Sequence, residues 1–345
     1  MSVFPLYAIG KIMVANFSNS PDWNKQPDGI LNCKFVKTPN VYYLQVDGYT
    51  NAETLKNPLY HYDNLKFDGW LQSNGFTLYD HFRSNYNSTL LSNSSCFNMK
   101  HHYARENVGF KNASDYVMDD NAVLDIFKSN GYKTFFLTER PYFLVSRPQI
   151  KYDYCNFNSS EVPYFKDGWS AFKEITDETK HQILENKSTS NFFFIQKFNP
   201  GHISVSKAAS KGIEGERLEY IKKLEIANAW LTDIIGFINK NDPNAIVIIG
   251  ADHGGFVGLT YTGDAFAKIK DPDILHSIFG AKAAIKWNSS QHADYDGKLK
   301  TSVNLFRTLF SFLSADKSYL NELQPDASYN NYDHVDFRKI YKAIE

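Results

Sequence analysis

Cysteine is scarce in this chain of 345 residues. The three cysteines are Cys33, Cys96 and Cys155, and no two of them form a CxxC pair. A zinc site built from thiolates is therefore not expected, because such sites use closely spaced cysteine pairs. An odd number of cysteines also argues against a disulfide framework.

Long hydrophobic runs and an excess of charge are absent too. No segment reaches the apolar length of a membrane-spanning helix, and the mildly apolar opening at residues 4–14 lacks the basic region and cleavage site of a signal peptide. We therefore expect the chain as given to be soluble, with no signal peptide or transmembrane segment. The formal net charge is −1, so no overall field attracts nucleic acid, and an anionic substrate must be held by local charge.

Apolar runs alternate along the chain with segments of helical periodicity. The strand-like runs are at about 40–46, 76–79, 132–137, 191–198, 245–249 and 281–286. The helical segments are at about 63–74, 120–130, 216–239 and 301–313. This order predicts an α/β fold, with a doubly wound, mainly parallel sheet sandwiched by helices. Residues 140–190 are less regular, and we interpret them as an insertion on the substrate side.

Two of the predicted strands are followed by residues that can bind a metal. Asp47 follows the first strand, and the pair Asp252-His253 follows the strand at 245–249. Open α/β sheets bind ligands beyond the carboxyl ends of their strands, so these side chains could share a cation. Carboxylates and a neutral imidazole suit zinc or manganese. Simpler alternatives are an Asp-Gly turn at Asp47, and a helix cap with a local hydrogen bond at Asp252-His253.

A polar stretch at residues 84–92 offers hydroxyl groups as nucleophiles. A hydroxyl is a weak nucleophile at its ordinary pKa, and a divalent cation can activate it. Thr89 is the candidate, although a helix N-cap would explain this residue equally well. His202 follows the strand at 191–198. It could contact a phosphoryl oxygen or protonate a leaving group, or be an ordinary surface-loop histidine.

Several short segments resemble, in order, the sulfatase-like branch of the alkaline phosphatase superfamily. They lie at 37–50, 74–76, 84–89, 98–99, 120–121, 131–133, 252–254 and 303–307. They are most similar to the lipoteichoic-acid-synthase-like and phosphoethanolamine-transferase-like enzymes. The resemblance covers about residues 37–315, which predicts a lead-in at 1–36, a catalytic domain at 37–315, and a C-terminal extension at 316–345 packed on the same domain.

The resemblance implies specific roles for residues of this chain. It implies one divalent cation, manganese or zinc with magnesium possible, with these ligands: Asp47, Thr89, Asp252 and His253. It implies that Thr89 is a nucleophile that becomes transiently esterified, and that His202 contacts the substrate. Further candidates for substrate binding are Asn98, His102 and His292, although His101-His102 could be an ordinary polar turn.

Two departures from the family pattern limit which reactions and how many cations we expect. Cys96 is not followed by the x-Pro-x-Arg sequence of true sulfatases, which argues against sulfate-ester hydrolysis. Phe198 stands where two-metal phosphodiesterases of the superfamily have an aspartate, which argues against a second cation.

The expected function is transfer of a phosphoglycerol- or phosphoethanolamine-type group through a phospho-threonine intermediate. The donor would be a phospholipid or another phosphodiester, and the acceptor a glycan or lipid. The expected place is the cell envelope, close to the outer side of the cytoplasmic membrane. One alternative is a phosphodiesterase or phosphatase that uses water as acceptor. Another is a catalytically silent glycan-binding module, which the 16% aromatic content would suit.

Overall fold

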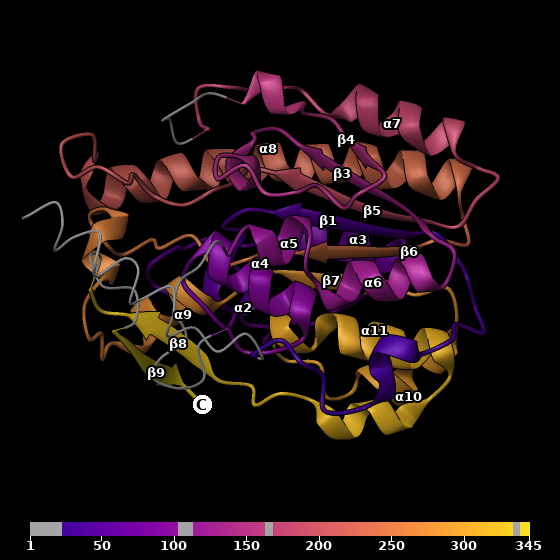
Figure 1. Cartoon of the computed structure of the whole chain (residues 1–345). Coiled ribbons are helices and arrows are strands. Elements are labelled where there is room, and N and C mark those ends of the chain that lie inside the picture. The colour runs from indigo at the N-terminus through magenta and orange to yellow at the C-terminus, as the bar shows by residue number, and fades with distance from the viewer. Residues whose placement is uncertain (1–22, 103–112, 163–167, 334–338) are drawn as a thin grey trace, which may run out of the picture.

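The computed structural model describes residues 23–102, 113–162, 168–333 and 339–345 (Figure 1). Residues 1–22, which include the apolar opening and most of the predicted lead-in, lie outside the described part. A seven-stranded sheet forms the centre, in the order β2-β7-β6-β1-β5-β3-β4. Its strands are β1 (Val41–Val46), β2 (Phe76–Leu78), β3 (Lys133–Thr138), β4 (Tyr154–Cys155), β5 (Asn191–Lys197), β6 (Ile246–Gly250) and β7 (Ala283–Lys286).

Strand β1 lies at the centre and runs parallel to both of its neighbours. Leu44 is paired with Ile195 of β5 on one side and with Ile249 of β6 on the other. Every residue of β1 is buried, as expected for a strand with both faces covered by helices. Because the three strands end at the same height, the residues that follow them meet at one end of the sheet.

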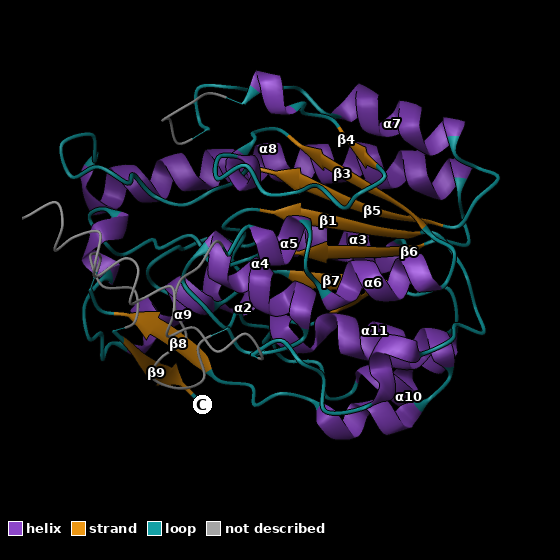
Figure 2. Ribbon diagram, viewed as in Figure 1, coloured by secondary structure: helices purple, strands orange, loops and turns teal. Residues whose placement is uncertain are grey.

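Helices cover both faces of the sheet (Figure 2). The helices are α2 (Ala52–Leu55), α3 (Leu65–Ser73), α4 (Thr89–Asn98), α5 (Asp115–Met118), α6 (Ala122–Ser129), α7 (Thr176–Glu185), α8 (Gly212–Asn241), α9 (Pro272–Phe279), α10 (Ala293–Asp296) and α11 (Leu305–Ser314). On one side lie α7 and α8, and on the other α4, α6 and α11. The predicted α/β fold with a mainly parallel sheet between helices is therefore confirmed. Strand β7 runs against the other strands, so its pairings with β2 and β6 are antiparallel.

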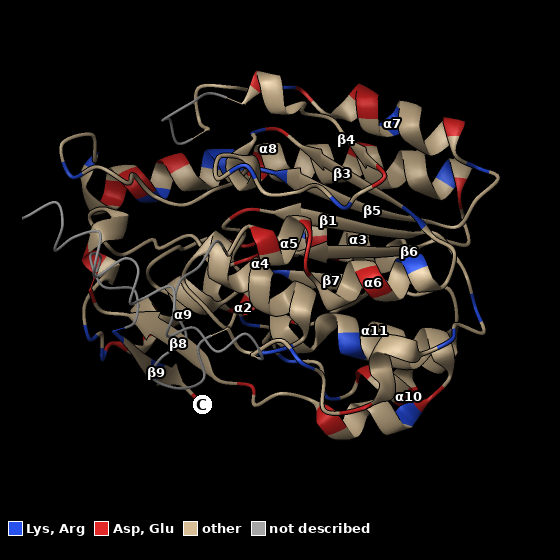
Figure 3. Cartoon of the chain, in the orientation of Figure 1, with Lys and Arg blue, Asp and Glu red and all other residues tan. Residues whose placement is uncertain are grey.

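The C-terminal residues form a separate two-stranded antiparallel sheet of β8 (Ser328–Asn331) and β9 (Ile340–Ile344). The Tyr329 backbone N–H donates to the Asn85 carbonyl oxygen at 2.8 Å, and the Ser328 hydroxyl donates to the Ser84 carbonyl oxygen at 2.6 Å. These bonds attach the C-terminal sheet to the segment that leads into α4. Among the helices that the structure describes, none is both long and apolar enough to cross a bilayer. Helix α8, which has 30 residues, carries acidic and basic side chains along its length (Figure 3).

Candidate active site

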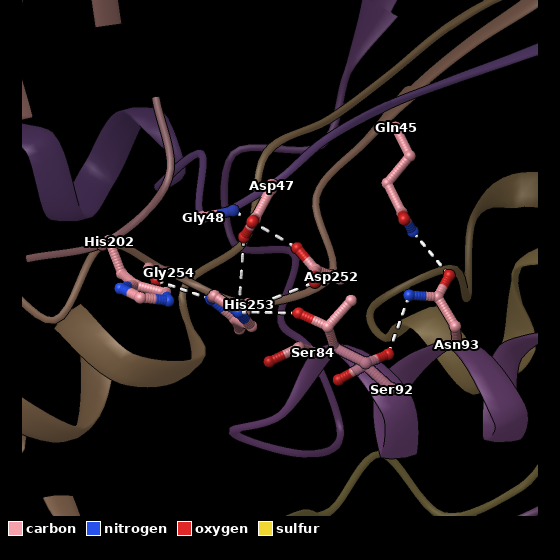
Figure 4. A network of polar contacts seen from close by, with 12 residues as sticks. Gln45, Asp47, Gly48, Ser84, Ser92, Asn93, His202, Asp252, His253 and Gly254 are labelled. Carbon is pink, nitrogen blue, oxygen red and sulfur yellow. Dashed lines mark hydrogen bonds and ion pairs between the residues drawn. The ribbon is translucent and has the colours of Figure 1, made fainter. Parts of the chain in front are cut away.

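Three buried side chains converge beyond the carboxyl ends of β1 and β6. Asp47, Asp252 and His253 each offer a ligand atom, and these atoms all lie within 4.8 Å of one another. His253 Nε2 is 3.5 Å from Asp47 Oδ1 and 3.6 Å from Asp252 Oδ2. Figure 4 shows the three side chains pointing toward one another. Separations of this size are too long for good hydrogen bonds, so the groups are arranged around a shared point and are not bonded to each other.

The hydrogen-bonding state of these atoms fits a divalent cation. Asp47 Oδ1 and Asp252 Oδ2 are buried and have no hydrogen-bond partner among the described residues. An unpaired charge in a protein interior costs several kcal/mol unless a counter-charge is present. His253 Nδ1 donates to the Gly254 carbonyl oxygen at 2.8 Å, which leaves the lone pair of Nε2 directed at the cluster. Two carboxylates and an imidazole are a donor set suited to manganese or zinc.

Burial and the charges within the cluster also shift the pKa values of Asp47 and His253. Burial, and next the charge of Asp252, raise the pKa of Asp47 from 3.8 to about 7. For His253 burial acts to lower the pKa, but the charges of Asp252 and Asp47 outweigh it and the pKa is raised above 6.5. A bound cation would replace the protons that these groups otherwise retain.

Thr89 reaches the same cluster from a third element. It is the first residue of α4, and its Oγ1 lies 3.3 Å from His253 Nε2. The N-cap residue is Ser88, not Thr89, and the Ser88 side chain makes no capping bond. The amino end of a helix favours negative charge, because its N–H groups and dipole point outward. A phosphoryl group next to Thr89 would therefore meet a favourable field.

His202 stands beside the cluster, in the loop after β5. Its ring centroid is 5.7 Å from that of His253. The Nδ1–H donates to the Ile203 carbonyl oxygen at 2.7 Å, which leaves Nε2 as an acceptor. Burial, and next the charge of His253, lower the pKa of His202 to about 4, so the ring is neutral at pH 7.

A cavity of about 720 Å³ opens beside Asp47 and His202. Its wall includes Arg140, whose guanidinium lies 5.3 Å from the ring centroids of both Trp169 and Phe172. None of these three residues is among the site residues predicted from the sequence. Arg140 follows β3 by two residues, so its position after a buried strand is the same signal that marks Asp47.

Two of the weaker candidates lie away from the cluster, in the interior of the protein. Asn98 ends α4, about 13 Å along the helix axis from Thr89. Its amide donates to the carbonyl oxygens of Ser94 and Tyr116. His102 is fully buried, and its Nδ1 is 2.8 Å from Ser94 Oγ. The structure does not bring either residue to the cavity.

His292 lies at the opposite end of the sheet. It follows β7, which runs antiparallel to β6, so the chain leaves β7 at the amino end of the parallel strands. Its ring stacks on Trp287 at a centroid distance of 5.4 Å, and its Nδ1 is 2.8 Å from Asp296 Oδ2. These contacts give His292 a structural environment, remote from the candidate site.

No family model and no curated protein sequence matches the chain. Solved structures do match. The zinc complex of the C-terminal periplasmic domain of EcEptC from Escherichia coli has a TM-score of 0.54 at 14% identity, over 89% of this chain and 93% of that one. The lipooligosaccharide phosphoethanolamine transferase A from Neisseria meningitidis, an integral membrane protein, has a TM-score of 0.56 at 15% identity, over 90% of this chain and 61% of that one.

A third match extends the likeness beyond the transferases. It is a protein (BT33494S-sulf) from the glycosaminoglycan-metabolism locus of Bacteroides thetaiotaomicron, with a TM-score of 0.57 at 10% identity, over 89% of this chain and 84% of that one. Identities this low show the shared fold alone. The chain has an alkaline-phosphatase-like α/β fold, as the resemblance in its sequence predicts.

Proposed function

We propose that this protein is a metal-dependent phosphotransferase, which moves a phosphoglycerol- or phosphoethanolamine-type group from a phosphodiester donor to a glycan or lipid acceptor. The observation that carries the proposal is the position of Thr89. Its Oγ1 lies 3.3 Å from His253 Nε2, within a cluster that holds two unpartnered carboxylate oxygens. The phosphoethanolamine transferases with the same fold support the choice of reaction.

Four residues would hold the cation: Asp47, Thr89, Asp252 and His253. We propose manganese or zinc, and the zinc complex of a similar periplasmic domain supports zinc. A bound cation supplies positive charge that lowers the pKa of a nearby hydroxyl and offsets the charge of a phosphoryl group. Phe198 takes the place where a second-metal ligand would stand, so one cation is proposed.

In the first step Thr89 Oγ attacks the phosphorus of the donor. The bond from phosphorus to the donor's alcohol oxygen breaks, and the proton that Thr89 gives up ends on the departing alcohol. The product of this step is a phosphodiester on Thr89. The amino end of α4 would stabilise the negative charge on its non-bridging oxygens.

In the second step a hydroxyl of the acceptor attacks the same phosphorus, and Thr89 is restored. His202 is neutral at pH 7 with Nε2 as an acceptor, so it suits a hydrogen bond from the attacking hydroxyl, whose proton ends on Thr89 as the bond from Thr89 to phosphorus breaks. This assigns His202 the role of orienting the acceptor hydroxyl, in preference to protonation of a leaving group. The donor is proposed to be a phospholipid at the outer side of the cytoplasmic membrane, in line with similar chains that are periplasmic domains.

The proposal can be tested with a nitrophenyl phosphodiester of glycerol and the purified protein, with manganese or zinc added. Wild-type protein should release an initial burst of nitrophenol equal to the protein concentration, since covalent intermediates accumulate when their resolution is slow. Thr89→Ala should lose at least about 10³-fold in turnover and keep its fold. Ser88→Ala is the matched control, because this neighbouring hydroxyl makes no capping bond.

Product analysis separates the alternatives. Transfer to an added glycan or glycerolipid supports the phosphotransferase, whereas glycerol phosphate as the sole product supports a phosphodiesterase. Absence of bound metal, together with no rise in melting temperature on adding manganese or zinc, would favour a silent glycan-binding module. Wild-type turnover in Thr89→Ala would refute the mechanism.

A further inference from the structure

A row of buried polar side chains crosses the sheet on the side of α4. Gln45 of β1 is the register partner of Gln196 of β5, which is in turn the partner of Thr138 of β3. Gln196 Nε2 donates to Gln45 Oε1 at 3.1 Å, and Thr138 Oγ1 donates to Gln196 Oε1 at 3.2 Å. None of the three is more than 1% exposed. Each side chain in the row is therefore fixed by its neighbour on the next strand.

The row continues from the sheet to the first turn of α4. Gln45 Nε2 donates to Asn93 Oδ1 at 2.6 Å, and Asn93 Nδ2 donates to the Thr89 carbonyl oxygen at 2.8 Å. Figure 4 shows the amides of Gln45 and Asn93 facing each other beside the candidate metal cluster. The chain of bonds thus ends on the backbone of the residue that carries the proposed nucleophile.

A contribution to stability does not explain why these buried side chains are polar. Buried polar groups contribute little net stability even when they are fully hydrogen-bonded, and an apolar core of the same shape would fill this space. A satisfied buried network does fix a single arrangement of the elements that it joins. Here it joins α4 to β1, and Asp47 lies two residues after Gln45, on the same face of the chain.

We propose that Gln45 and Asn93 are positioning residues, which hold Thr89 at the height where its Oγ1 meets the cluster of Asp47, Asp252 and His253. This inference rests on the proposed function, because it takes Thr89 to be the nucleophile. Small displacements matter in such sites, since misplacing a reacting group by about 1 Å can cost about 10²-fold in rate.

The test compares Asn93→Leu and Gln45→Met with a matched control, Asn98→Leu. Asn98 is a buried asparagine of the same helix, and its amide donates to the Ser94 carbonyl oxygen four residues earlier at 2.8 Å, just as Asn93 bonds to Thr89. The readouts are kcat, KM, the Kd for manganese and the melting temperature, with the nitrophenyl phosphodiester as substrate.

Asn93→Leu and Gln45→Met should each lower kcat by about 10- to 100-fold, with KM within about twofold of wild type. The manganese Kd should rise, because Thr89 is one of the proposed ligands. The double variant should lose no more than the worse single variant, because the two residues act as one unit. Asn98→Leu should lower the melting temperature by a similar amount and keep kcat within about twofold of wild type.

Wild-type kcat in Gln45→Met and Asn93→Leu overturns the positioning role, and so does an equal loss of kcat in Asn98→Leu. If Asn93→Leu fails to fold, Gln45→Met, which leaves α4 unaltered, decides alone. Turnover in Thr89→Ala rejects the proposed function and the positioning role with it. Inactive Thr89→Ala alongside fully active Gln45→Met rejects the positioning role alone.

Discussion

Gly48 and Gly201 touch backbone to backbone at the candidate site. A Cβ atom on Gly48 would lie 2.2 Å from the Gly201 carbonyl oxygen, and Gly48 has a positive φ of 65°. The Gly201 N–H also donates to the Asp47 carbonyl oxygen at 2.8 Å. The turn that carries Asp47 and the loop that carries His202 therefore hold each other in place.

Gly48→Ala should disable the site, because the new methyl group forces these two loops apart. We expect metal affinity and turnover each to fall by at least about 10-fold. The loss in the free energy of unfolding should exceed the ~1 kcal/mol expected for placing an alanine at positive φ without a clash. Gly75→Ala is the control, since Gly75 has a φ of 83° and open space around its Cβ position. Metal titration and urea unfolding of both variants give the comparison. Equal effects in the two variants would contradict the close-contact argument.

In the metal-free protein, the carboxyl group of Asp47 should contribute a loss of stability as the pH rises from about 4 to about 7, seen as the difference between wild type and Asp47→Asn. The pKa of Asp47 is about 7 in the folded protein and 3.8 ordinarily, so over this range the folded state holds a proton that the unfolded chain has released. Its stabilising effect is complete below pH 3.8 and is lost by about pH 7.

Asp47→Asn should remove this contribution and leave the opposite contribution of the buried His102 and His202 in place. At pH 8 with a chelator present, it should be more stable than wild type by ~2–4 kcal/mol, since one pKa unit corresponds to about 1.4 kcal/mol. Adding manganese should reverse the order of stability, because the variant lacks a ligand. Melting curves at several pH values, with chelator and with manganese, measure both effects. A metal-free variant less stable than wild type at pH 8 would rule out repulsion between the two buried carboxylates.

Strand-end reasoning predicts much of the cluster from the sequence alone. Asp47, Asp252 and His202 all follow mainly apolar runs that form fully buried strands, and parallel strands bring the residues after such runs together. Helix α4 gives no comparable signal. Eight of its ten residues are buried, among them Asn93 and Ser95, so no apolar stripe marks its inner face.

The sequence also does not supply the register between distant strands, which decides where each candidate histidine lies. His102 and His202 are alike as residue types, and both could bind a substrate. His102 is enclosed among aromatic rings, whereas His202 lines the cavity. The difference depends on where the chain turns, which is set by contacts between residues far apart in sequence. For His292, the antiparallel direction of β7 decides the end of the sheet, and β7 is too short for its direction to be predicted.

His102 should destabilise the protein in acid without any effect on activity at pH 7. Burial lowers its pKa to about 3 in the folded state, against 6.5 ordinarily. The unfolded chain therefore binds a proton first, and stability falls as the pH decreases from 6.5 toward 3, by up to ~1.4 kcal/mol per pH unit. His102→Gln can still bond to Ser94 but does not titrate, so its stability should decline less steeply. Urea unfolding between pH 4 and 7 measures this slope, and His181→Gln, at an exposed position, is the control. If wild type and His102→Gln differ in turnover at pH 7, the result would contradict this prediction and support a role of His102 in substrate binding.

Arg307 of α11 should be the main attachment of residues 23–33 to the domain. Its side chain is fully buried, with Nη1 2.7 Å from Asp28 Oδ2 and Nη2 2.6 Å from Gln26 Oε1. Removing one partner of a fully buried ion pair costs ~3–5 kcal/mol, because the other charge loses its compensation, whereas replacing both by apolar groups can be nearly neutral. The cost should be at the lower end here, because Asp28 is 20% exposed and Arg307 keeps its bond to Gln26.

Asp28→Leu alone should therefore be strongly destabilising, and the double variant Asp28→Leu/Arg307→Met should recover most of the loss. Arg217→Met is the control, since its partner Glu214 is exposed, and it should unfold close to wild type. Urea unfolding of wild type, Asp28→Leu, Arg307→Met and the double variant gives the coupling between Asp28 and Arg307 directly. A double variant no more stable than Asp28→Leu would mean that the attachment depends on packing around Arg307 and not on the ion pair.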